Sequence, residues 1–117
     1  MRDGREQIRA LVETVFPKGA RVVALPGRGE FQLLVSWRLG TDPARPSKRS
    51  KTVRILIEEE ALDAFRQANE SQRGYSVTRL RAMLARRLEL FDPNHDTPMG
   101  VEPPIEKWTI GTVELNG

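Results

Sequence analysis

Residues 31–39, FQLLVSWRL, alternate between apolar and polar side chains almost without interruption. The side chains that fall on one side of such a strand are Phe31, Leu33, Val35, Trp37 and Leu39. The opposite side carries Gln32, Ser36 and Arg38. Because successive side chains of a strand point to opposite faces of a sheet, this pattern predicts a strand with one buried face.

A second alternating run, KTVRILI at residues 51–57, follows after Gly40 and a linker that contains Pro43 and Pro46. Val53, Ile55 and Ile57 alternate there with Thr52, Arg54 and Leu56. Two half-buried strands joined in this way predict an antiparallel hairpin with a long tip.

The remaining patterns predict three helices and two more strands. A helix is expected over residues 3–16, with Asp3 and Glu6 in a capping box, and a strand over 20–25. A second helix is expected over 58–72, ended by Gly74, and a third from an N-cap at Ser76 to residue 91. KWTIGTVEL at 107–115 predicts a last strand with a bulge at Gly111. The order α-β-β-β-α-α-β over residues 1–117 favours a single α+β domain, with a mostly antiparallel sheet and helices on one face.

Bulk composition narrows the class of protein. A chain of 117 residues, 38% apolar and 30% charged, fits one globular domain. No apolar run approaches the roughly 18–20 residues that a membrane span needs, and the charged N-terminal stretch leaves no room for a signal-peptide core. We therefore expect a cytoplasmic protein. The absence of cysteine excludes disulfides, thiolate metal sites and a cysteine nucleophile.

One short stretch carries the excess positive charge. Residues 45–54, RPSKRSKTVR, contain five cations and no acid: Arg45, Lys48, Arg49, Lys51 and Arg54. Without these five, the 19 Lys and Arg of the chain fall to 14 against 16 Asp and Glu, and the formal net charge changes from +3 to −2. Such a stretch is expected to contact an acidic partner, a nucleic acid or an acidic protein. The alternative is a solvated hairpin tip whose charges prevent aggregation.

The third predicted helix offers a second basic surface, formed by Arg79, Arg81, Arg86 and Arg87. Arginines on the solvent side of a helix serve solubility equally well, so nucleic-acid contact and simple solvation both remain open for this helix.

No catalytic or metal-binding constellation is recognisable. The only histidine, His95, lies in FDPNHDTP, where Asp92, Asn94 and Asp96 match the first three ligand positions of a calcium loop. The match ends there, because Thr97 replaces the required glycine and Pro103 the closing glutamate. We therefore expect no metal, no cofactor and no enzymatic activity.

Residues 51–91 resemble a ribbon-helix-helix DNA-binding domain: the strand KTVRILI, a helix, the Gly-Tyr-Ser turn at 74–76 and a second helix that begins SVTRL. The resemblance implies a dimer whose paired strands enter the major groove, with Thr52 and Arg54 on bases and the backbone at Ser76 on phosphates. If residues 31–39 pair with this strand instead, the ribbon cannot form.

The whole layout also resembles a small family of bacterial proteins known only as a domain of unknown function. The resemblance rests on VSW at 35–37, DPARPSKRSKT, FDPNHDTP, and the later PP and EKW. It implies no activity. Our first hypothesis is therefore a monomeric, non-enzymatic binding domain that uses the basic hairpin, and the alternative is the dimeric ribbon-helix-helix regulator.

Overall fold

The computed structural model describes residues 4–26, 29–40, 44, 48–98 and 100–116. Its elements follow the chain as α1 (Arg5–Val15), β1 (Arg21–Leu25), β2 (Phe31–Ser36), β3 (Thr52–Ile57), α2 (Glu59–Gln67), α3 (Glu70–Leu90), β4 (Ile105–Ile110) and α4 (Thr112–Asn116). The expected α+β class and the order α-β-β-β-α-α-β are confirmed, with one short helix added at the C-terminal end.

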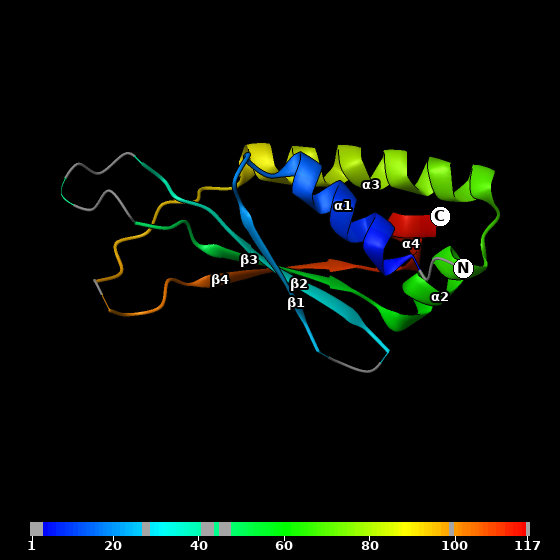
Figure 1. Cartoon of the computed structure of the whole chain (residues 1–117), viewed down its shortest axis with the longest axis horizontal. Coiled ribbons are helices and arrows are strands. Elements are labelled where there is room, and N and C mark those ends of the chain that lie inside the picture. The colour runs from blue at the N-terminus through cyan, green and yellow to red at the C-terminus, as the bar shows by residue number, and fades with distance from the viewer. Residues whose placement is uncertain (1–3, 27–28, 41–43, 45–47, 99, 117) are drawn as a thin grey trace.

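The four strands form one sheet in the order β1-β2-β3-β4. The two pairs β1–β2 and β2–β3 are antiparallel, and β3–β4 is parallel. The parallel pair follows from the helices between β3 and β4, because a crossover connection carries the chain back to the end where β3 began. Helices α1, α3 and α4 lie on one side of the sheet (Figure 1). We call the other side the open face.

The covered face supplies the core. Phe31, Leu33 and Val35 of β2 and Val53, Ile55 and Ile57 of β3 are all at most 7% exposed. In register, Leu33 pairs with Ile55 and Val35 with Val53, so the two predicted strands form a hairpin within one chain. At one end of the core, four rings lie with centroids 5.7–6.0 Å apart: Phe16, Trp37, Phe91 and Trp108.

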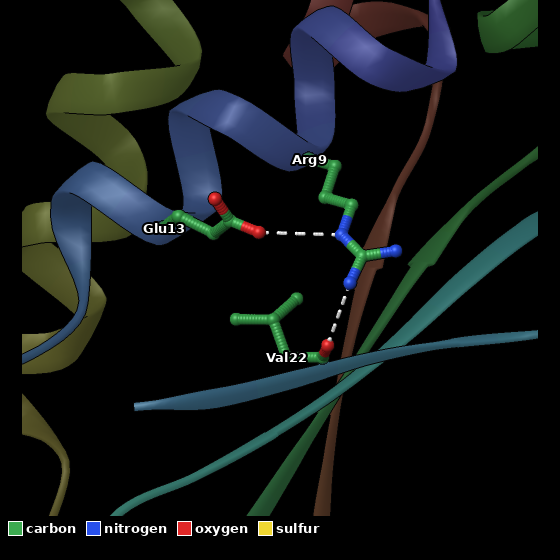
Figure 2. A network of polar contacts seen from close by, with 3 residues as sticks. All are labelled: Arg9, Glu13 and Val22. Atoms are coloured by element: carbon green, nitrogen blue, oxygen red, sulfur yellow. Dashed lines mark hydrogen bonds and ion pairs between the residues drawn. The ribbon is translucent and has the colours of Figure 1, made fainter. Parts of the chain in front are cut away.

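The edge strand β1 is tied to helix α1. Arg9 Nη2 donates to the Val22 carbonyl at 3.0 Å, while Arg9 Nε pairs with Glu13 Oε1 at 3.2 Å (Figure 2). An edge strand exposes backbone groups that can pair with other chains. The Arg9 contact occupies one of these acceptors and fixes α1 against this edge.

The predicted boundary between the second and third helices is wrong. Helix α2 ends at Gln67 and α3 already begins at Glu70, so Gly74 and Ser76 lie inside α3. Asn69 caps α3: its side chain accepts from Gln72 N–H, and the Gln72 side chain accepts from Asn69 N–H. This capping box satisfies N–H groups at the helix start, whereas a glycine within a helix costs only about 1 kcal/mol.

The predicted C-terminal strand is also wrong beyond Ile110. Instead of a bulge, Gly111 is followed by α4, and its N–H donates to Glu114 Oε2 at 2.9 Å. The turn into α4 brings Leu115 into the core, where it is 0% exposed. The change of apolar phase near Gly111 thus marks the end of a strand and the start of a helix.

Helix α1 starts at Arg5 with Gly4 at its N-cap, and Asp3 of the predicted capping box lies outside the described residues. Gly4 has φ +89°, and a Cβ placed there would lie 2.8 Å from Cδ1 of the fully buried Phe65. Only glycine combines this backbone conformation with such close packing. In the part of the chain that the structure describes, no helix is long and apolar enough to cross a membrane.

We predict that Gly4→Ala lowers the free energy of unfolding by about 2–4 kcal/mol, because backbone strain adds to a clash with a core ring. Gly19→Ala is the matched control, since Gly19 has φ +84° but no atom within 4 Å of its would-be Cβ. It should cost about 1 kcal/mol from strain alone. Chemical denaturation of both variants measures the difference, and equal losses would contradict the packing of Gly4 on Phe65.

Candidate binding surface on the arm and the open sheet face

The β2–β3 hairpin continues beyond both strands as an arm, which we define as residues 37–40 and 48–51. Ser50 N–H donates to the Trp37 carbonyl at 2.7 Å, and Leu39 N–H donates to the Lys48 carbonyl at 3.0 Å. Arg38 and Arg49 lie opposite each other as an isolated antiparallel bridge. The arm projects from the end of the sheet (Figure 1).

One extra residue lies on the β3 side where the arm begins. Val35 pairs with Val53, but Arg38 pairs with Arg49, so the intervening stretch is one residue longer on the β3 side than on the β2 side. This is the pattern of a β-bulge. Ser50, 1% exposed, compensates for the interrupted ladder, because its Oγ accepts from Trp37 N–H at 3.1 Å.

The extra residue decides which face Arg49 occupies. An odd shift in register moves side chains to the other face of a sheet. Arg49 therefore lies on the open face, where its Nε and Nη2 donate to Ser36 Oγ and its Nη2 also donates to the Ser36 carbonyl, at 2.9–3.2 Å. Lys51 lies on the helix side, with Nζ 5.5 Å from the centroid of the Phe91 ring.

The five cations predicted from the sequence therefore do not form one cluster. Arg54 lies on the open face and donates to Gln32 Oε1 at 2.6 Å. Lys48 is half-buried, and its carbonyl accepts a hydrogen bond from Leu39 N–H across the arm. Arg45 lies outside the described residues.

The register brings together cations that are far apart in the sequence. Arg21 of β1 pairs with Ser36, and Lys107 of β4 pairs with Arg54. Paired residues share a face of the sheet, and neighbouring strands lie about 4.8 Å apart. With Arg38 and Arg49, the open face and the arm thus carry a set that we call the basic surface: Arg21, Arg38, Arg49, Arg54 and Lys107. Sequence reasoning missed Arg21, Arg38 and Lys107, although each stands at a position that alternates with apolar core residues.

The charge of the basic surface is not neutralised within the described part of the chain. There the ion pairs are Arg9–Glu13 and Arg66–Asp63, and neither includes a residue of the basic surface. Glu30, at the far end of β2, accepts from Gln32 Nε2 at 2.6 Å. Arg49 and Arg54 are thus held by neutral side chains and backbone, with no direct carboxylate partner in the described part of the chain.

The loop at 92–98 supports the arm. The Pro93 carbonyl accepts from Lys51 N–H at 2.9 Å, and His95 Nε2 lies 2.8 Å from the Arg49 carbonyl. His95 Nδ1 accepts from Thr97 N–H at 3.2 Å, so Nε2 carries the proton and donates. Both nitrogens of the only histidine are therefore used to fix the loop against the arm.

Asp92 forms a turn at the start of this loop. Its Oδ1 accepts from the backbone and side-chain N–H groups of Asn94, both at 3.0 Å. These bonds lower the pKa of Asp92, with a smaller contribution from the charge of Lys51. They stabilise the turn above the ordinary pKa of an aspartate, and this contribution is lost as the pH falls through the lowered pKa. Across the described residues, no group of three or more acidic or histidine side chains is placed to hold a metal ion.

The residues of the ribbon-helix-helix alternative are not arranged as that family requires. Thr52 and Arg54 lie on the open face, but β3 pairs with β2 on one side and with β4 on the other. Strand β3 thus has no free edge for a second copy. Ser76, predicted as an N-cap, lies within α3 and is 5% exposed, so its backbone is not at a helix start.

A scan against protein-family models gave no match, and searches of curated proteins and of solved structures gave no significant match.

We predict that Ser50→Ala lowers the free energy of unfolding by about 1–3 kcal/mol, because it leaves the buried N–H of Trp37 without its acceptor. Ser76→Ala is the matched control, a second buried serine whose removal should change stability by less than about 0.5 kcal/mol. Denaturation curves compare the two, and amide exchange at Trp37 should accelerate only in Ser50→Ala. Equal stability of both variants would contradict the role of Ser50 at the bulge.

Proposed function

We propose that this protein is a non-enzymatic binding domain that holds an acidic macromolecule, a nucleic acid or an acidic protein, against the basic surface. One observation carries the proposal. Five cations from three strands and the arm share one side of the sheet, and none of them has a carboxylate partner among the described residues. A continuous field of one sign attracts partners of the opposite sign.

The fixed orientation of two arginines supports binding over simple solvation. Arg49 is held by Ser36, and Arg54 is held by Gln32. A freely solvated arginine loses rotamer entropy when it is bound, whereas a side chain already held in place loses less. The neutral partners fix the guanidinium groups without neutralising them.

The open face lacks stacking side chains. Trp37 and Trp108 are at most 9% exposed and contact the ring cluster on the covered side. Proteins that bind single strands without sequence preference combine cations with exposed aromatic side chains. The composition of the open face therefore favours contacts to charged groups over stacking on bases.

The arginines of α3 are a weaker candidate surface. Arg79 lies 5.7 Å from the Tyr75 ring centroid, and its Nη2 donates to the Val113 carbonyl at 3.4 Å. Arg81 and Arg86 are exposed on α3. They provide an internal control for non-specific charge effects.

The proposal assigns the domain to the bacterial cytoplasm as a monomer, since β3 has no free edge for the predicted dimer.

We predict that Arg21→Gln/Arg38→Gln weakens binding to a 20-base-pair DNA duplex or to polyglutamate, whichever binds the wild type, by about tenfold at low salt. The matched control is Arg81→Gln/Arg86→Gln, which also removes two positive charges from exposed positions. It should change affinity less than twofold. Fluorescence anisotropy across a salt series gives both affinities. Equal losses in the two variants, or no binding of either probe by the wild type, would contradict the proposal.

A further inference from the structure

A hollow beside the arm gathers three cations, and no acidic residue is among the described residues that line it. Its volume is about 480 Å³, and it is lined by Pro17, Lys18, Gly19, Trp37, Arg38 and Arg49. Strand β1 begins only at Arg21, opposite Ser36. Beyond that point β2 has no neighbouring strand on this side, and the hollow fills the space between the arm and the turn that leads from α1 into β1.

The turn holds Lys18 in a defined place. Ala20 N–H donates to the Pro17 carbonyl at 2.9 Å, which closes a four-residue turn with Gly19 at φ +84°. A positive φ at the third position is typical of a type II turn, for which glycine is the preferred residue. Because no atom lies within 4 Å of a would-be Gly19 Cβ, the glycine also leaves this wall of the hollow open.

Arg49 is oriented by the protein and still has donors to spare. Nε and Nη2 donate to Ser36, and these are its hydrogen bonds within the described chain. A guanidinium has five N–H donors, so Nη1 keeps its own two for a ligand. The half-buried position beside the 9%-exposed Trp37 lowers the local dielectric and strengthens contacts with an anion.

We propose that this hollow binds a phosphate group, with Arg49 as the oriented donor and Lys18 and Arg38 as flanking charges. Arginine with its planar set of donors suits the oxygens of phosphate, and lysine adds a point charge. The inference rests on the proposed function and narrows it, because the acidic partner would carry phosphate instead of carboxylate. The phosphate belongs either to a nucleic-acid backbone or to a small phosphorylated molecule.

The test is an NMR titration of the full chain with inorganic phosphate at constant ionic strength, with chloride as the comparison anion. We expect saturable shifts of the Gly19 and Arg38 amides and of Arg49 Nε–H with phosphate, and none with chloride. Arg49→Gln should weaken phosphate binding about tenfold, the loss of a charge-assisted hydrogen bond. Arg49→Lys, which keeps the charge but loses the planar donors, should weaken it as well. The control Arg81→Gln removes an exposed cation of α3, outside both the hollow and the basic surface, and should change affinity less than twofold.

Unsaturable shifts, identical shifts with chloride, or equal losses in Arg49→Gln and Arg81→Gln would overturn the phosphate site. If the protein still binds polyglutamate, the proposed function remains. If it binds no anionic probe at all, both the phosphate site and the proposed function are wrong. If phosphate binds, a DNA duplex and adenosine monophosphate distinguish the sources. If the protein binds the duplex at least 100-fold more tightly than the mononucleotide, and Arg49→Gln reduces this affinity, the phosphate belongs to a nucleic-acid backbone. The reverse order of affinities means that it belongs to a small phosphorylated molecule.

Discussion

The arrangement of charge in this protein depends on the contact between Trp37 and Ser50. Trp37 anchors the end of β2 in the ring cluster, and Ser50 satisfies its N–H through Oγ and its carbonyl through the backbone N–H. This pair lets the β3 side carry one extra residue without leaving a buried polar group unpaired. The extra residue places Arg49 on the open face, whereas Lys51 lies on the helix side beside Phe91.

The helices cover one side of the sheet and leave the other side open (Figure 1). All the apolar strand positions that face the helices are used by the core, and the helices cover this side alone (Figure 1). The open face therefore presents the alternate positions, on which Arg21, Arg54 and Lys107 are brought together from three strands. The same alternation that builds the core thus builds the basic surface.

Local pattern predicted most of the fold. The hairpin of β2 and β3, its buried face and the order of elements follow from alternation with a period of two and from turn residues. The helix boundary near residue 70 was missed because glycine and serine at 74–76 suggest a break, whereas the Asn69–Gln72 capping box decides the start of α3. The strand-to-helix change at Gly111 depends on the burial of Leu115, a tertiary contact.

The candidate site was only partly predictable. A run of cations is visible in the sequence, but the face that Arg49 occupies depends on a single extra residue, and no local signal reports it. Arg21 and Lys107 join the surface through pairing of distant strands, and Lys18 joins the hollow through a turn beside the arm. Such contacts become predictable only when the sheet order and register are known.

The most direct test of this account is the cross-strand register of the arm, measured by NMR nuclear Overhauser effects. The account predicts contacts of Val35 with Val53 and of Arg38 with Arg49 in one chain. Contacts of Arg38 with Ser50 would mean that the extra residue is absent and that Arg49 faces the helices. The basic surface and the phosphate hollow would then both be wrong.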